Sequence, residues 1–280
     1  MRYCHKKAEK KLKKEGWGKM KKVFTFVLTI TLLLCSGWSS HFYFASDEKT
    51  IEIEPQLYMG YGYSGVLTKD GNLYMWGYNW CGQIGNGDKE QQLTPVKVLD
   101  NVVLASLGYL HSGAVTEDGS LYMWGNNELG GVGNGTTEHQ FLPIKVLDNV
   151  VNVVLGAYHS AAITKDGSLY MWGENDSGQV GNGTTEDQHL PEKVLDNIVS
   201  AAVTFDVAES AMTGAIAEDG SLYMWGYNED GSLGNGIATG IQTIPLKIME
   251  CKKNVSDLIQ QIEEVEGKCY QEKCVKRLEF

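Results

Sequence analysis

The clearest pattern of apolar and polar positions lies in the third quarter of the chain. Four apolar segments follow one another there: VVNVVLG at 150–156, SAAIT at 160–164, SLYMWG at 168–173 and PEKVL at 191–195. Short segments rich in β-branched and aromatic residues, separated by Gly, Asn and Asp, predict strands. The Asp166-Gly167 pair between the second and third segments supplies the positive φ of a tight hairpin turn. We therefore predict four short antiparallel strands in one small sheet.

The third of these strands indicates how the sheet packs. Leu169 and Met171 point to one face, and Tyr170 and Trp172 point to the other, because side chains alternate along a strand. Both faces are therefore apolar, whereas a sheet with one face in water alternates apolar with polar residues. We predict that each sheet is enclosed between two others, as the blades of a propeller are.

The same pattern occurs four times along the chain. The tryptophans of a repeated Met-Trp-Gly are spaced by 48, 48 and 53 residues, and each is followed by Gly-x-Asn-x-x-Gly-x-x-Gly-Asn-Gly. A period near 50 residues is typical of units that stack on their neighbours. Because every copy keeps these residues, we interpret them as structural rather than as an ion-binding loop. The predicted repeat core comprises Trp76, Trp124, Trp172, Trp225, Gly85, Gly133, Gly181 and Gly234.

The segment HSAAITKDGSLYMWGENDSGQVGNGTT, which begins at His159, closely resembles the repeat of the RCC1-like (regulator of chromosome condensation) family. The resemblance covers roughly residues 57–248. It implies an all-β fold, an RCC1-like β-propeller or partial propeller of about four blades with four antiparallel strands each. The family usually builds seven blades, so a small ring, an open arc and a dimer that completes a ring all remain open here.

The family resemblance also implies a range of functions. Its members are mostly binding platforms. Some exchange nucleotide on a small GTPase, one plant member senses ultraviolet light through clustered tryptophans, and a secreted bacterial member inhibits β-lactamases. The Arg-rich setting of the light sensor is absent, because Arg2 and Arg277 are the only arginines.

Two histidines occupy the family's Gly-x-x-His-Ser positions, His111 and His159. The corresponding positions of the first and fourth repeats hold Tyr63 and Met212. A catalytic or metal-binding histidine pair is therefore not expected, and we predict that both rings hold loops by hydrogen bonds. The fourth repeat also has five extra residues before its Met-Trp-Gly. Its VTFDVAES at 203–210 replaces the usual Gly-x-x-His segment.

The N-terminal 45 residues read as a targeting segment. Residues 1–22 carry ten Lys or Arg and two Glu, and the 23 residues that follow have no formal charge. A basic flank before an apolar stretch is typical of a signal peptide, with Met20 as a plausible start and cleavage after Ala45, and the stretch is also long enough for a membrane anchor. Lipidation of Cys35 is a further alternative. In each case we expect residues 46–280 to be secreted or membrane-anchored outside the cytoplasm.

The remainder of the chain divides into two predicted parts. The RCC1-like repeats occupy 46–249, approximately as 46–100, 101–148, 149–196 and 197–249, and a helical Cys-containing tail occupies 250–280. The tail carries Cys251, Cys269 and Cys274, and one disulfide among them is plausible outside the cell. The apolar residues of VSDLIQQIEEVEG fall on one helical face, which would cover a blade edge or bind a partner.

Charge and missing motifs exclude several function classes. Residues 46–280 contain 14 basic and 33 acidic side chains, a net charge of −19. Nucleic acids and anionic lipid headgroups require a basic surface, so neither is an expected partner. The chain has no G-x-S-x-G, HExxH or P-loop motif, and its GYGYSG belongs to the repeat rather than to a nucleotide-binding turn. We predict no enzyme activity, no cofactor and no metal.

The variable positions of the loop after each repeated tryptophan remain as candidate binding residues. A rigid scaffold that varies aromatic and acidic loop residues is typical of a protein-binding surface. We select Tyr78, Trp80, Glu128, Asp176, Tyr227, Glu229 and Asp230. The predicted function is a non-catalytic extracellular or membrane-anchored protein-binding scaffold. The alternatives are a guanine-nucleotide exchange factor-like regulator of a small GTPase and a cell-surface glycan-binding module, and a homodimer through exposed blade edges or the C-terminal helix is possible.

Overall fold

The computed structural model describes residues 54–205 and 210–250. The chain divides into two compact units, 1–50 and 51–280, and the described residues all belong to the second. Their regular structure consists of sixteen β-strands in four separate four-stranded antiparallel sheets. The all-β prediction is therefore confirmed for this part of the chain, and we call each sheet a blade.

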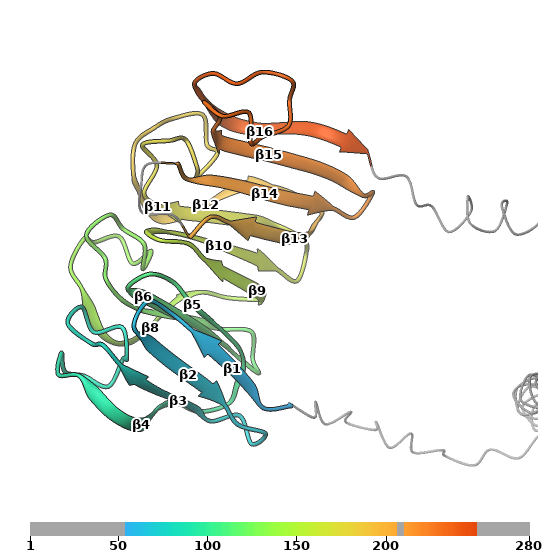
Figure 1. Cartoon of the computed structure of the whole chain (residues 1–280). Helices are drawn as coiled ribbons and strands as arrows, with labels where there is room; N and C mark the ends of the chain where they lie inside the picture. The colour runs from blue at the N-terminus through green and yellow to red at the C-terminus, as the bar shows by residue number, and fades with distance from the viewer. Residues whose placement is uncertain (1–53, 206–209, 251–280) are drawn as a thin grey trace, which may run out of the picture. The chain divides into compact units, whose positions relative to one another are not determined.

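The blades follow one another in chain order (Figure 1). Blade 1 contains β1 (Gln56–Met59), β2 (Tyr63–Leu67), β3 (Leu73–Gly77) and β4 (Gln92–Leu99). Blade 2 contains β5 (Val102–Leu107), β6 (His111–Thr116), β7 (Leu121–Gly125) and β8 (Gln140–Leu147). Blade 3 contains β9 (Val150–Leu155), β10 (His159–Thr164), β11 (Leu169–Gly173) and β12 (Gln188–Leu195). Blade 4 contains β13 (Ile198–Val203), β14 (Met212–Ala217), β15 (Ser221–Tyr227) and β16 (Ile241–Glu250).

Each blade is a simple meander whose turns follow from the repeated sequence. In blade 3, Gly167 has a φ of 80° in the turn between β10 and β11, as the Asp-Gly pair predicts. Asp166 completes this turn, because its carboxylate accepts hydrogen bonds from the Thr164 hydroxyl (2.6 Å) and the Ser168 amide (3.1 Å). Asn197, with a φ of 59°, leads from this blade to the next and is one of three asparagines that do so. Asn tolerates this conformation better than most residues do.

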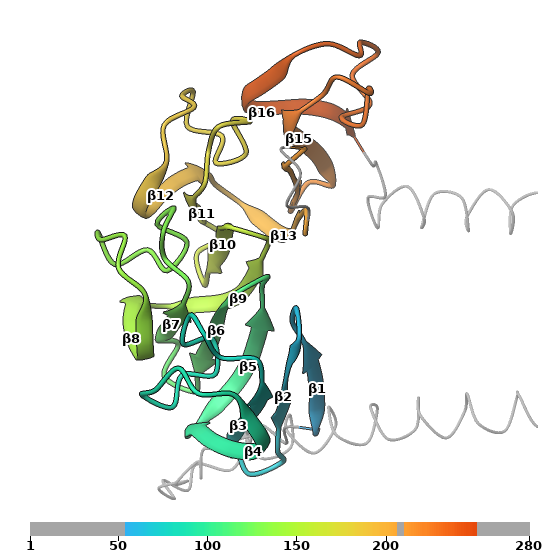
Figure 2. The same cartoon turned by 60° about the vertical axis from the view of Figure 1, so that its left-hand side comes forward.

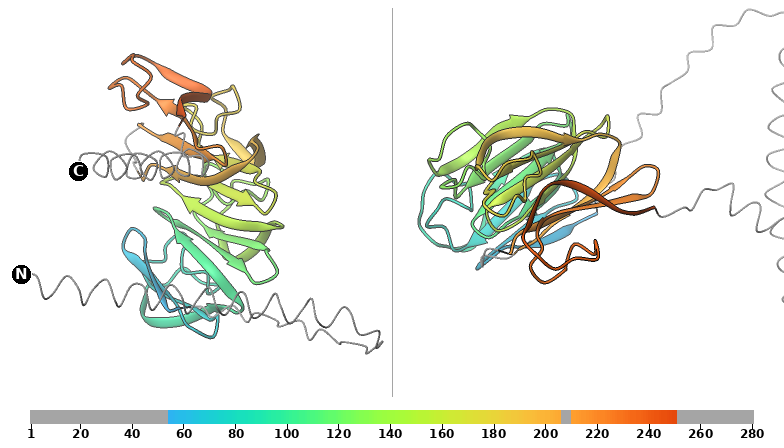
Figure 3. Two further views of the ribbon diagram at one scale, coloured as in Figure 1. Left: turned by 90° about the vertical axis from the view of Figure 1, so that its right-hand side faces the viewer. Right: turned by 90° about the horizontal axis from the view of Figure 1, so that it is seen from above.

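The hydrophobic core lies between the blades rather than inside any one of them. One buried cluster joins each blade to the next, and the contacts that connect neighbouring blades come mainly from their first two strands. The predicted enclosure between two neighbours is confirmed for blades 2 and 3. Within residues 54–205 and 210–250, blades 1 and 4 have a neighbouring blade on one side only, and strands β1 and β16 lie at opposite ends of the row (Figures 2 and 3).

Several expectations concern residues outside the described part. The targeting segment 1–45, the helical tail 250–280 and its three cysteines fall there, apart from Glu250 at the end of β16. Among the described residues, none forms a helix with the length and apolar character that a membrane crossing requires.

Candidate functional surface

Two loops lie side by side at the same end of every blade. The first is the turn between the first two strands, and the second is the loop that follows the repeated tryptophan. In blade 2, the Asn126 amide donates to the Leu110 carbonyl at 2.8 Å, and in blade 3 the Glu174 amide donates to the Tyr158 carbonyl at 3.2 Å. The same contact recurs in blades 1 and 4. These paired loops form one surface, which we call the loop end.

A buried asparagine fixes the shape of each post-tryptophan loop. In blade 2, the Asn127 side-chain oxygen accepts from the Val132 amide at 2.9 Å, while its nitrogen donates to the Thr136 and Glu138 carbonyls. Asn79, Asn175 and Asn228 bond their own loops in the same way. Because these amides are fully or almost fully buried and satisfied, the loops are rigid supports for the residues at their tips.

The repeated glycine and tryptophan join each loop to the following blade. A Cβ on Gly133 would lie 2.7 Å from the indole nitrogen of Trp172, so only glycine fits against the ring. That indole donates to the Gly131 carbonyl at 2.9 Å, and Trp124 and Trp225 make the equivalent bond to the loops of blades 1 and 3. Gly85 and Gly181 contact Trp124 and Trp225 in the same manner.

In each of the two end blades, one residue of the tryptophan–glycine contact has no partner among the described residues. Trp76 is only half-buried, whereas the other three repeated tryptophans are fully buried. The nearest contact to a Cβ on Gly234 is Ile248 at 3.8 Å, and no tryptophan lies against it within the described residues. The tryptophan–glycine pair is therefore a feature of the junctions between blades.

The seven candidate binding residues lie at the loop end but do not form one patch. Tyr78 and Trp80 stack with ring centroids 5.4 Å apart, and Trp80 is 70% exposed. The four acidic candidates are exposed, and Tyr227 of blade 4 is half-buried. Among the described residues, no ring contact joins Tyr227 to the Tyr78–Trp80 pair.

A second group of aromatic residues, which the sequence reasoning missed, does connect the blades. The Tyr109 ring of blade 2 lies 4.5 Å from Tyr61 of blade 1, 5.7 Å from Tyr158 of blade 3 and 6.4 Å from Phe205 of blade 4. Tyr61 and Phe205 are 58% and 47% exposed. We call these four residues the aromatic cluster. Each comes from the turn between the first two strands of its blade, so the cluster spans all four blades.

The aromatic cluster adjoins acidic side chains of the post-tryptophan loops. Burial raises the pKa of Tyr158, and the charges of Glu174 and Glu128 raise this pKa further. Glu128 is exposed and lies 3.9 Å from a ring nitrogen of His139. The loop end therefore combines exposed aromatic rings, which are typical anchors of protein interfaces, with carboxylates.

The two histidines behave differently from each other. Ser160 donates its hydroxyl hydrogen to the Gly131 carbonyl at 2.8 Å, so its oxygen accepts from Nε2–H of His111 at 3.0 Å. The predicted hydrogen bond is thus confirmed for His111, but its partner is Ser160 of strand β10, which in turn bonds the loop at Gly131. The prediction is wrong for His159, whose two nitrogens are buried without a hydrogen-bond partner among the described residues. In the fourth repeat Thr213 replaces this serine; its hydroxyl donates to the Gln179 carbonyl at 2.8 Å, as Ser160 does to Gly131, but it makes no hydrogen bond to His159.

The buried rings are held in their neutral form. Burial lowers the pKa of His159 to about 4. Burial together with the nearby His159 lowers the pKa of His111 to about 3. Neither ring is placed to exchange protons with solvent near neutral pH, and the described residues contain no group of three or more His, Cys, Asp or Glu that could hold a metal ion.

Comparison with known families gives four matches along the chain. The model of the regulator of chromosome condensation (RCC1) repeat matches residues 70–115, 118–163, 166–204 and 219–263, and a second model of this repeat matches 102–130 and 150–179. The first match contains β3 and β4 of blade 1 followed by β5 and β6 of blade 2. One sequence repeat therefore straddles two blades.

Solved structures show the same fold. Prp20p from Saccharomyces cerevisiae, described with its binding properties to Gsp1p and histones, is 27% identical with a TM-score of 0.60 over 71% of this chain and 51% of its own. Yeast RCC1 (Prp20) bound to Kap60 is 26% identical with a TM-score of 0.61 over 71% and 49%. Human WBSCR16 is 24% identical with a TM-score of 0.58 over 69% and 52%, which supports the fold alone. The chain spans about half the length of these structures.

Proposed function

Because the chain belongs to the RCC1 repeat family, we propose that it acts as a non-catalytic protein-binding scaffold. The observation that carries this proposal is the aromatic cluster, in which each blade contributes one ring to a single patch, with Tyr61 and Phe205 exposed and Tyr109 and Tyr158 half-buried. Exposed aromatic residues on a rigid support bury a large area at a low cost in conformational entropy, which makes them typical interface anchors.

The acidic side chains around the aromatic cluster indicate which partner surface would be complementary to it. The negative charge of Glu128 acts on the Tyr158 hydroxyl and raises its pKa, and residues 46–280 are strongly acidic as a whole. A partner with a basic rim around an apolar centre complements this surface best. The Tyr78–Trp80 pair extends the aromatic area at the blade 1 side of the loop end.

The scaffold is proposed to face the outside of the cytoplasm, either secreted or anchored. This part rests on the basic flank and the uncharged segment at 23–45. Protease added to intact cells tests it, because the repeats are digested only if residues 46–280 are exposed outside the membrane. Protection of the repeats in intact cells would contradict it.

The binding proposal is tested by affinity capture with three forms of the full-length protein. The wild type is compared with a Tyr61→Ala/Phe205→Ala variant and with a Leu142→Ala/Leu190→Ala control, which also removes two exposed apolar side chains but from the strands β8 and β12. We expect the wild type and the control to retain the same protein and the cluster variant to lose it. Retention by all three forms, or by none, contradicts the assignment of the surface.

The exchange-factor alternative is favoured by one observation, the likeness to Prp20p, which was characterised with Gsp1p. A fluorescent-nucleotide release assay on a small GTPase separates the two functions. Accelerated release at catalytic amounts of the chain would replace our proposal, whereas a rate equal to intrinsic release supports it. Quenching of Trp80 fluorescence by polysaccharide would instead favour the glycan-binding alternative.

A further inference from the structure

The three junctions between blades share one arrangement on the covering side. The first strand of each following blade inserts two apolar side chains toward the blade before it. On β5 and β9 these side chains are almost fully buried, with exposed fractions between 3% and 7%. The covering pairs are Ala105 with Leu107, Val153 with Leu155, and Ala201 with Val203.

The receiving side uses the same residue types at all three junctions. It consists of a branched residue on the second strand and a Leu and a Met on the third. In blade 3 these are Ile163, Leu169 and Met171, and none of the three is more than 4% exposed. Leu67, Leu73 and Met75 in blade 1 and Val115, Leu121 and Met123 in blade 2 are buried in the same way.

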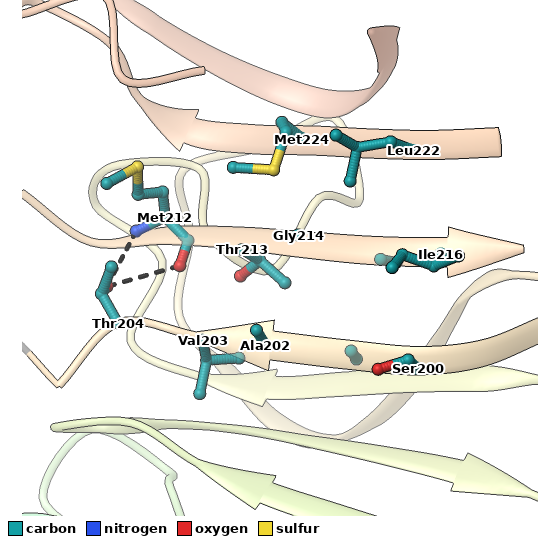
Figure 4. A pocket seen from close by; sticks show the side chains of 12 residues that line it. Ser200, Ala202, Val203, Thr204, Met212, Thr213, Gly214, Ile216, Leu222 and Met224 are labelled. Atoms are coloured by element: carbon teal, nitrogen blue, oxygen red, sulfur yellow. Dashed lines mark hydrogen bonds between the residues drawn. The ribbon is translucent and has the colours of Figure 1, made fainter. Parts of the chain in front are cut away.

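Blade 4 has the receiving side but no blade to cover it. The equivalent residues are Ile216, Leu222 and Met224, which lie together on β14 and β15 (Figure 4). Ile216 is 43% exposed, and Leu222 and Met224 are only half-buried. They line an apolar groove of about 270 Å³. This face therefore differs from that of a capping repeat, whose outer surface is polar.

Blade 1 has the covering side but no blade beneath it. The Tyr58 hydroxyl accepts from the Ala105 amide of blade 2 at 3.3 Å, so Tyr58 faces forward along the row. Its neighbours Leu57 and Met59 therefore face backward, because side chains alternate along a strand. They pair with Val66 and Ser64, as Val153 and Leu155 pair with the equivalent residues of blade 3. Leu57 is 62% and Met59 is 68% exposed.

The two members of a tryptophan–glycine pair are also found at opposite ends of the row, the tryptophan in blade 1 and the glycine in blade 4. Trp76 of blade 1 is half-buried, and Gly234 of blade 4 has no tryptophan against it among the described residues. At the three internal junctions these two residue types meet directly. Blade 1 thus carries a covering pair and a tryptophan, and blade 4 carries a receiving face and a glycine. Within the described residues, none of these four features has the partner that it contacts at the internal junctions.

We propose that a second copy of this chain seats the back of its blade 1 on the front of blade 4. Leu57 and Met59 of one copy fill the groove at Ile216, Leu222 and Met224 of the other, and Trp76 packs on Gly234. This junction is heterologous, since two different surfaces meet. It is independent of the loop end and of the partner proposed there.

The test uses two differently tagged full-length copies, co-expressed and purified on one tag. Wild-type copies co-purify. When both copies carry the same charged substitution, every possible contact includes a charge in the apolar junction. Two Leu57→Glu copies therefore do not co-purify, and neither do two Ile216→Glu copies. Leu57→Glu paired with Ile216→Glu does co-purify, because one copy keeps an intact front and the other an intact back. Leu190→Glu, at a 60% exposed position on β12, serves as the matched control and retains association.

Every other pattern overturns the proposal. Association of copies that both carry Leu57→Glu places the contact elsewhere, and failure of the mixed pair indicates a junction of two identical surfaces. If wild-type copies do not associate but do so after deletion of residues 251–280, the chain's own tail occupies the groove instead. The circular dichroism of each variant is compared with that of the wild type, so that loss of association is not mistaken for loss of folding.

Discussion

Replacement of Gly133 by alanine tests the physical basis of the blade junctions. Gly133 has a φ of 81°, and its added Cβ would lie 2.7 Å from Nε1 and 2.8 Å from Cδ1 of Trp172. The ring has no room to retreat, because it is fully buried and its nitrogen donates to the Gly131 carbonyl at 2.9 Å. The backbone conformation costs roughly 1–2 kcal/mol for a residue with a Cβ. Overpacking adds about 1–3 kcal/mol, so the expected loss of stability is about 2–5 kcal/mol.

The matched control is Gly236→Ala in blade 4. Gly236 has a similar φ of 84°, but apart from its chain neighbours none of the described residues lies within 4 Å of its added Cβ, so the variant should lose only the backbone contribution of roughly 1–2 kcal/mol. Urea denaturation followed by tryptophan fluorescence measures both variants against the wild type. If the two variants lose the same stability, the tryptophan contact does not restrict this position and the reasoning is refuted.

Two further predictions concern buried polar groups. Trp172→Phe should lower the free energy of unfolding by about 1–3 kcal/mol because it removes the indole hydrogen bond to the Gly131 carbonyl, which keeps only the Ser160 donor, and leaves a cavity at the junction. Trp76→Phe, at a half-buried ring, should cost less in the same urea experiment. The pKa of His159 is near 4 in the folded state, below its unfolded value of about 6.5. The unfolded state therefore binds the proton first, and the free energy of unfolding decreases as pH falls from 6.5 toward 4, with no further contribution from His159 below pH 4. His159→Met should therefore flatten the decline of the melting temperature in this pH window while leaving stability at pH 7 equal or higher, because no hydrogen bond is removed. An unchanged acid response of this variant would show that His159 does not titrate with unfolding.

Local patterns predicted the strands well because a blade is built from short-range rules. The strands predicted at 150–156 and 168–173 match β9 and β11 closely, since alternation and an Asp-Gly turn suffice to set them. The predicted strand at 191–195 is longer in the structure, where β12 begins at Gln188. The added residues are Gln188, His189 and Leu190, and the single apolar residue before Pro191 does not by itself mark the start of a strand.

The aromatic cluster was not predictable in the same way. Its members occupy two different positions of the repeat, because Tyr109 directly follows Gly108 whereas Tyr158 is separated from Gly156 by one residue. Only the stacking of blades brings such turns together. The signal that could have revealed them is an aromatic residue in every one of these turns, including Phe205 in the irregular fourth repeat.

The offset between sequence repeat and blade has an evolutionary consequence. A unit such as residues 70–115 contributes the last two strands of one blade and the first two strands of the next. Duplication or loss of such a unit lengthens or shortens the row by one whole blade, with every internal junction rebuilt from the same residue types. Leu57 would still lie at one end and Ile216 at the other. The number of blades can therefore drift between relatives without any change in the chemistry of the two ends.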